Sequence, residues 1–183
     1  MKPEDCVLFS GAARGAEATF GAAAERHGVA EVNFTFDGHK DTRTRGIRVL
    51  TRPELKEGDV SLSYVSRLMH RSYADTPLFR SVLQSIWHQV HHGEEVYVVG
   101  QILEDDTVKG GTGWGAELAK LHNKPLFVFD QTREAWHRWA NEAWQECPPP
   151  TIGRLRFTGT GTRFLNDAGE RAIGELFDRT FGG

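Results

Sequence analysis

Apolar residues in this 183-residue chain occur both in short continuous runs and in longer stretches with helical spacing. The continuous runs lie at 6–10, 95–100 and 125–130, and each is bounded by glycine or polar residues. Runs of this length are typical of strands that are buried on both faces of a parallel sheet. The segment EVNFTF at 31–36 alternates and predicts another strand, and GIRVL at 46–50 predicts a short one.

The clearest helix is predicted between the runs, at 76–93. Thr76 suits its N-cap, Pro77 suits its first turn and Gly93 suits its end. One face of this helix would carry the apolar residues Leu78, Val82, Leu83, Ile86, Trp87 and Val90.

Further helices follow the other predicted strands. An alanine-rich segment predicts a helix that ends near His27, and 59–71 predicts a weaker one. Residues 110–115 are rich in glycine and lead into a helix that ends near Asn123. The tail contains a strand at 154–158 and then a helix, at whose start Asp167 and Glu170 fit a capping box.

Strands that alternate with helices predict a Rossmann-like α/β fold, a three-layer α/β/α arrangement around a mostly parallel sheet of five strands. The length favours a single domain over 1–183. Residues 135–146 contain alternating tryptophans and predict a small exposed hairpin, and PPP at 148–150 predicts a rigid linker.

The formal net charge is −3, so no broad basic surface favours nucleic acid as a partner. Only Cys6 and Cys147 occur, which predicts neither a disulfide framework nor a cysteine metal site and favours a reducing compartment. The N-terminus lacks a signal-peptide core, and no apolar run approaches the roughly 20 residues needed to cross a membrane. We therefore expect a soluble cytoplasmic protein without a membrane partner.

Three glycine loops occur between predicted strands and helices, at 10–17, 109–117 and 158–163. In parallel sheets, ligands bind beyond the carboxyl ends of the strands, and the N–H groups at a helix N-terminus suit a phosphate. The loops therefore predict a nucleotide pocket rather than plain tight turns. Its phosphate-binding residues would be Ser10, Gly11, Arg14, Gly15, Lys109, Gly110, Gly111, Thr112, Gly113, Gly159, Thr160, Gly161 and Arg163.

The three loops also carry a family resemblance. SGAARGAEATFGAAAERHG and VKGGTGWGAELAKLHNKPLFVFDQ resemble two motifs of DNA-processing protein A-like sequences, and FTGTGTRFLNDAGERAI resembles the YTGIGSR motif with which such proteins begin. The chain thus resembles the SLOG superfamily of Rossmann-like proteins, which also includes the "lonely guy" phosphoribohydrolases. Residues 40–75 are poorly covered by this resemblance.

The order of the motifs differs from that of the family, because the segment that normally comes first lies here at the C-terminus. This order indicates a circular permutation, which a fold tolerates when its original termini lie close together. The resemblance then implies that strand 154–158 inserts between 6–10 and 95–100. The sheet order would be 32–36, 6–10, 154–158, 95–100, 125–129, all parallel, with Arg154 and Arg156 near the rim.

Glu117 is the candidate catalytic residue. It follows Gly110 at the offset of the catalytic glutamate in the phosphoribohydrolase motif PGGxGTxxE, although Lys109 and Trp114 replace the proline and threonine of that motif. The arginine motif of these enzymes is not evident, since LMHRS at 68–72 is too far upstream. The alternative is that Glu117 is a first-turn acid favoured by the helix dipole.

Contacts to a ribose or base are expected from Glu117, Asp130 and Trp114. Asp130 ends a strand, and GTGWGA at 111–116 matches the pattern GxGxxA, but the intervening loop argues against a nicotinamide dehydrogenase. Three tryptophans of the hairpin, Trp136, Trp139 and Trp144, would either stack on a base or partner or pack the hairpin on its own domain.

Three histidines, His88, His91 and His92, end one predicted helix. His88 and His92 share a face that zinc could use, but no third ligand is evident, so no metal site is predicted.

The leading function is therefore the binding of a nucleotide-like small molecule of unknown identity, as a sensor or carrier, with no certain cofactor. The second hypothesis is hydrolysis of a nucleotide N-glycosidic bond by Glu117. The third is single-stranded DNA binding, which the acidic balance disfavours. A homo-oligomer is left open.

Overall fold

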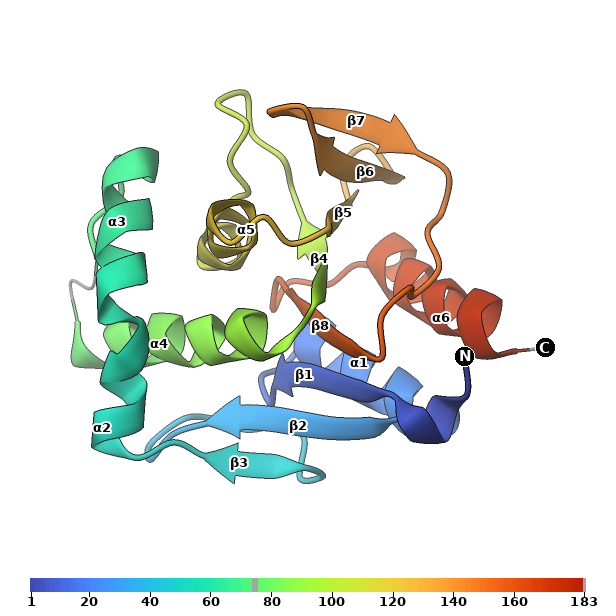
Figure 1. Cartoon of the computed structure of the whole chain (residues 1–183), viewed down its shortest axis with the longest axis horizontal. Helices are drawn as coiled ribbons and strands as arrows, with labels where there is room; N and C mark the ends of the chain where they lie inside the picture. Colours follow the sequence, from blue (N-terminus) through green and yellow to red (C-terminus); the bar gives the residue numbers. More distant parts are fainter. Residues whose placement is uncertain (74–75, 183) are drawn as a thin grey trace.

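The computed structural model describes residues 1–73 and 76–182. One eight-stranded sheet runs through the molecule in the order β3-β2-β1-β8-β4-β5-β6-β7 (Figure 1). The strands are β1 (Val7–Gly11), β2 (Ala30–Thr35), β3 (Ile47–Val49), β4 (Glu95–Gly100), β5 (Leu126–Asp130), β6 (Ala135–Ala140), β7 (Ala143–Cys147) and β8 (Arg156–Gly161).

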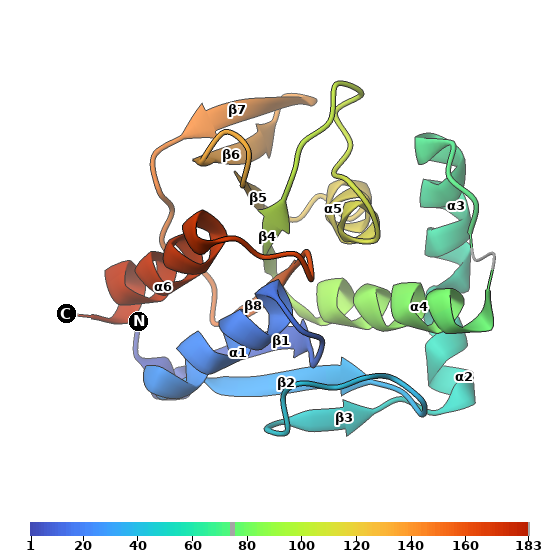
Figure 2. The same ribbon diagram turned by 180° about the vertical axis from the view of Figure 1, so that it is seen from behind.

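Helices cover both faces of this sheet, as the sequence predicts (Figures 1 and 2). They are α1 (Ala16–Arg26), α2 (Arg52–Leu55), α3 (Asp59–Met69), α4 (Pro77–His92), α5 (Thr112–Leu121) and α6 (Asp167–Phe181), with short 3-10 turns η1 (Pro3–Asp5) and η2 (Lys56–Gly58). One apolar core joins α1 and α6 to the sheet through Phe20 and Phe177. A second core joins α3, α4 and α5 to it through Leu62, Leu83 and Trp114, and a smaller third cluster contains Phe9, Phe34 and Leu50. No helix among the described residues is both long and apolar enough to cross a membrane.

The central part of the sheet confirms the predicted order and the parallel direction of β2, β1, β8, β4 and β5. Strand β8, from the end of the chain, pairs with β1 on one side and with β4 on the other. Phe157 and Thr158 are fully buried, whereas Arg154 and Arg156 are exposed at the start of the strand. The two arginines therefore lie at the rim, as expected.

The sheet has eight strands, not five, which corrects the sequence prediction. Strand β3 extends one edge in parallel, and β6 and β7 extend the other edge as an antiparallel hairpin. The hairpin is not an exposed appendage, because β6 pairs with β5 and buries Trp136 to 3% exposure. Trp136 packs against Phe129 and Tyr97, so the open edge of β5 and the adjoining core decide where the hairpin lies.

Helix α4 begins and ends as the sequence predicts. The Thr76 hydroxyl accepts a hydrogen bond from the Phe79 amide, Pro77 opens the helix and Gly93 follows its end. A side chain from a distant segment also caps the C-terminal end of α4. Lys124 Nζ donates to the carbonyl oxygens of Val90, His91 and Gly93 at 2.6, 2.8 and 2.5 Å.

The N-cap of α6 is Asn166 rather than Asp167. The Asn166 side-chain oxygen accepts a hydrogen bond from the Gly169 amide at 2.8 Å. The predicted capping box of Asp167 and Glu170 is therefore wrong, because the helix begins one residue earlier than such a box requires. The side chain of Asn166 accepts a hydrogen bond from the first turn, as an aspartate at the N-cap would.

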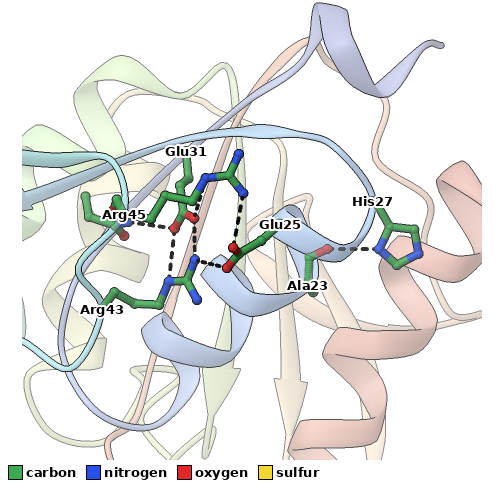
Figure 3. A network of polar contacts seen from close by, with 7 residues as sticks. Ala23, Glu25, His27, Glu31, Arg43 and Arg45 are labelled. Carbon is green, nitrogen blue, oxygen red and sulfur yellow. Dashed lines mark hydrogen bonds and ion pairs between the residues drawn. The ribbon is translucent and has the colours of Figure 1, made fainter.

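A network of charged side chains fastens the segment between β2 and β3 to the start of β2 and the end of α1 (Figure 3). The Glu31 side chain has no exposed surface and accepts hydrogen bonds from both Nε and Nη2 of Arg43. Arg43 also bonds Glu25 at 2.9 Å, and Arg45 Nε lies 3.7 Å from Glu31. Asn33 donates to Glu31 at 2.7 Å, so the buried carboxylate is paired on several sides.

Candidate functional site

The carboxyl ends of β8 and β4 form the point at which the sheet changes its winding. The helix that follows β8, α6, packs on one face, and the helix that follows β4, α5, packs on the other. In open parallel sheets, ligands bind at such a switch point. The glycine loops after β1, β4 and β8 all end at this edge.

Backbone hydrogen bonds join the first and third glycine loops to each other and to the end of β4, the strand that the middle loop follows. The Ala16 amide donates to the Thr162 carbonyl at 3.0 Å, and the Thr162 amide donates to the Val99 carbonyl at 2.9 Å. The Lys109 amide donates to the Gln101 carbonyl, just beyond the end of β4, at 2.9 Å. The three loops therefore lie at the same edge of the sheet.

Three cationic side chains lie on this surface, one on each loop. Arg14, Lys109 and Arg163 are all exposed. Across residues 1–73 and 76–182, no ion pair or side-chain hydrogen bond involves any of their charged groups. The Arg163 guanidinium lies 5.8 Å from the ring centre of Phe164, which is 73% exposed. The edge thus presents positive charge that the described chain leaves uncompensated.

The glycines of the middle loop fall into two kinds. A Cβ at Gly113 would lie 2.0 Å from the Val108 carbonyl oxygen, so this glycine is required by packing within the protein. Gly110 has φ +71° and open space around it, and a Cβ at Gly111 would meet only the Phe79 ring at 4.0 Å. Gly111 is also the N-cap of α5, and because it is glycine, no side chain caps the amides at the start of this helix. The accessible part of this loop is therefore Gly110–Gly111.

Arg71, which follows α3, holds the middle loop through hydrogen bonds to its backbone and to Thr107. Its Nη1 donates to the carbonyl oxygens of Val108 and Gly110 at 3.0 and 3.2 Å, and its Nη2 donates to the Thr107 hydroxyl at 2.7 Å. Arg71 belongs to the motif LMHRS, which lies far upstream of this loop in the sequence, but the fold places its side chain against the loop.

A buried carboxylate, which sequence reasoning missed, lies beneath the loops. Glu17 Oε1 accepts hydrogen bonds from Gln89 Nε2 and the Thr160 hydroxyl, both at 3.1 Å, and Oε2 accepts from the Ala13 amide at 3.3 Å. Burial raises the pKa of Glu17 above its ordinary value. A Cβ at Gly11 would lie 2.3 Å from Glu17 Oε2, so the glycine makes room for this carboxylate. The sequence signal that could have indicated this contact is the presence of Gly11 and Glu17 in the same glycine loop, 10–17.

Several predicted phosphate-binding residues are instead occupied inside the protein. The Ser10 hydroxyl donates to the Gly159 carbonyl, and the Thr160 hydroxyl donates to Glu17. A Cβ at Gly159 would lie 2.5 Å from the Phe20 ring, and one at Gly161 would lie 2.4 Å from the Val99 carbonyl oxygen. Likewise, a Cβ at Gly15 would clash with Thr162, and Thr112 is buried, so all these positions serve loop and strand packing.

Glu117 does not face the open loop. Its Oε1 accepts a hydrogen bond from Lys120 Nζ at 2.7 Å, and both side chains are close to 90% buried. Lys120 also lies 3.8 Å from the ring centre of Trp139 and 4.9 Å from that of Trp144. The pair therefore packs α5 against the hairpin, which accounts for these two tryptophans as well.

Asp130 and Trp114 likewise have structural partners. Asp130 Oδ2 accepts from the Ile102 amide at 2.9 Å, and Oδ1 accepts from the amides of Thr132 and Arg133 at 2.8 and 3.1 Å. Trp114 is 2% exposed and lies against Tyr73 in the core. Both side chains are thus held by contacts within the protein, and their contacts to a ribose or base stay a prediction.

The histidines at the end of α4 bond to backbone atoms. His88 Nε2 donates to the Glu54 carbonyl and His92 Nδ1 donates to the His88 carbonyl, both at 2.8 Å. Within the described part of the chain, no three histidine, cysteine, aspartate or glutamate side chains are grouped so that they could hold a metal ion.

A recess lies away from the glycine loops, between the hairpin and α6. Its lining includes Trp136, Cys147 and Arg171, but no residue of the three loops. We therefore place the candidate site at the charged loop surface, where the switch point and the uncompensated cations coincide.

These observations define a Rossmann-like α/β protein with a cationic loop surface at the carboxyl edge of its sheet. Comparison with solved structures matches the chain to the crystal structure of a putative molybdenum carrier protein from Syntrophus aciditrophicus SB. The match has a TM-score of 0.54 and 12% identity, and covers 97% of this chain and 96% of that one. At this identity, the similarity shows the fold alone. No family model and no curated protein matches the sequence.

Proposed function

We propose that this protein binds a small oxyanion-bearing ligand, a nucleotide or nucleotide derivative, and acts as a sensor or carrier. The observation that carries the proposal is the placement of Arg14, Lys109 and Arg163 on three adjoining loops, without ion-pair partners in the described chain. The open backbone of Gly110–Gly111 lies on the same surface, at the start of α5.

Each part of this surface suits a phosphate-like group. The Gly113 and Trp114 amides already donate to the carbonyls of Gly110 and Gly111, so the Gly111 amide and the helix dipole are what favours an anion at the start of α5. The guanidinium groups of Arg14 and Arg163 can each donate two parallel hydrogen bonds to oxyanion oxygens, and Lys109 adds a point charge. The exposed Phe164 ring offers an apolar face on which a base could stack.

The name of the structural neighbour supports the oxyanion part of this proposal. Molybdenum dissolves in neutral water as molybdate, a tetrahedral dianion whose charge and shape resemble those of phosphate. A ligand for the same surface could therefore be a free oxyanion or the phosphate of a nucleotide, and the experiment must separate the two.

The geometry gives less support to the other hypotheses. A hydrolase that uses Glu117 would need this carboxylate at the reacting sugar, but it is paired with Lys120 on the hairpin side of α5. Single-stranded DNA binding would need a longer basic track than three cations on a chain of net charge −3.

Calorimetric titration with nucleoside mono- and diphosphates, inorganic phosphate and molybdate tests the proposal. The variant Arg14→Gln/Arg163→Gln should bind at least about tenfold more weakly than the wild type, because two charge-assisted contacts are lost. Arg154→Gln is the matched control, since Arg154 is exposed at the opposite edge of the sheet and should leave affinity unchanged.

Tighter binding of nucleotides than of free phosphate would support a nucleotide ligand, and preference for molybdate would support a free oxyanion. Equal affinity of the double variant and the wild type, or no binding of any of these compounds, would contradict the proposal. Gly111→Glu is a second probe, because it adds a negative charge where space is open. Gly113→Val is unsuitable, since its clash with Val108 would disturb the loop itself.

A further inference from the structure

Helix α3 carries an exposed apolar stripe along its outer face. Val60 is 84% exposed, Tyr64 51% and Leu68 53%, and their spacing of four residues places them on one side of the helix. The opposite side is buried against α4 and α5 through Leu62, Val65 and Met69. Figure 1 shows α3 at the periphery of the molecule, so the stripe faces outward from the fold.

Polar residues border one side of this stripe. Asp59, Ser63 and Arg67 follow one another at the same four-residue spacing, and together with Val60 and Tyr64 they line a shallow hollow. Asp59 is half-buried, and its Oδ1 accepts hydrogen bonds from the Tyr73 hydroxyl and from Gln84 Nε2. The border therefore has an acid at its N-terminal end and a base at its C-terminal end.

The apolar stripe and its polar border are complementary to the same surface of a second copy whose α3 runs in the opposite direction. A two-fold axis through Tyr64 would place Val60 of one copy against Leu68 of the other and Tyr64 against Tyr64. The polar borders would then meet in opposite directions, so that Arg67 of each copy lies beside Asp59 of the other. In a parallel pair, the two polar borders would instead lie on opposite sides of the interface, so Arg67 of one copy would not reach Asp59 of the other.

We propose that the outer face of α3 is a self-association surface, on which α3 of a second copy of this chain packs antiparallel. The observations that select this partner are the apolar stripe and the reversed charge order along its border. An eleven-residue helix offers less area than the roughly 1,600 Å² of a standard interface, so the dimer is weak and forms at micromolar or higher concentration. This proposal does not depend on the ligand-binding surface.

Sedimentation velocity over a concentration series measures this association. The wild type should shift from monomer to dimer as its concentration rises, and Tyr64→Glu should weaken association at least tenfold. Arg67→Asp should weaken it too, since it sets an acid beside Asp59 of the other copy. Leu155→Glu is the matched control, because Leu155 is 47% exposed outside α3 and should associate like the wild type.

Cysteine cross-linking in a Cys147→Ser background tests the direction of the pair. Tyr64→Cys should form a disulfide-linked dimer, because residue 64 lies on the two-fold axis. Val60→Cys alone should not, since the two copies of residue 60 would lie about 12 Å apart along the helices. A mixture of Val60→Cys and Leu68→Cys should cross-link. A monomer at every concentration, or efficient self-linking of Val60→Cys, would overturn the proposal.

Discussion

At the residue scale, Glu31 shows how a buried charge is stabilised in this fold. Its fully enclosed carboxylate faces two arginines and an asparagine amide (Figure 3). Replacing it by glutamine leaves Arg43 without its buried partner, so we expect Glu31→Gln to lower the free energy of unfolding by about 3 kcal/mol. Urea denaturation followed by circular dichroism measures this loss.

Glu25→Gln provides the control for this prediction. Glu25 also pairs with Arg43, but its side chain is 54% exposed, and the loss should stay below about 1 kcal/mol. Equal losses in the two variants would show that burial of Glu31 does not decide the stability of the network.

Individual residues also show the limit of sequence reasoning about the site. The glycine loops and their place at one edge of the sheet were predictable, because glycine between a strand and a helix is a local signal. The roles of Ser10, Gly11 and Gly159 were not predictable, since each depends on a partner from a distant segment. Ser10 bonds a carbonyl 149 positions away, and Glu17 bonds a side chain 72 positions away. No local pattern encodes such contacts.

At the scale of elements, His88 joins α4 to α2 through the Glu54 carbonyl. Burial lowers the pKa of His88 below its ordinary value of 6.5. The folded protein therefore binds this proton less readily than the unfolded chain does, and the contribution of His88 to stability is lost as the pH falls below 6.5. We expect the wild type to lose more stability between pH 7 and pH 5 than His88→Gln, which can still donate to Glu54.

Unfolding curves for the two proteins at each pH give this difference. The comparison has to be made between variants, because the raised pKa of Glu17 acts in the opposite direction and stabilises the fold as the pH falls. Parallel pH profiles for the wild type and His88→Gln would contradict the prediction.

In the β6–β7 hairpin, the turn follows from the local sequence, whereas the position of the hairpin in the sheet depends on other parts of the fold. Its turn is local, since Asn141 and Glu142 both adopt positive φ, as a two-residue hairpin turn requires. Its attachment to β5 is not local, because it depends on an open sheet edge and on the core that receives Trp136. The sequence therefore predicted a hairpin but not its place in the sheet.

At the scale of the whole molecule, β8 connects the two halves of the sheet. A chain without residues 151–183 should not unfold cooperatively, because β1 and β4 would lose the strand between them. A rearranged chain, in which a short linker joins residue 183 to residue 1 and the chain begins at 151, should fold into the same sheet. Strand β1 starts and α6 ends at the same side of the molecule (Figure 1), so the linker can be short.

Thermal melting and circular dichroism distinguish these chains from the wild type. A cooperative transition in the truncated chain would contradict the bridging role of β8. Failure of the rearranged chain to fold, while the wild type folds, would contradict the interpretation that this sequence is a permuted form of the family order.

The central position of β8 also has a consequence for synthesis. A ribosome completes β1, β2 and β3, and then β4 to β7, before it adds the strand that joins them. Until then, β1 and β4 each present an unpaired edge, of the kind that pairs with strands of other chains. A nascent chain that stalls before residue 156 would carry both edges open, so completing the last stretch of translation protects this protein from aggregation.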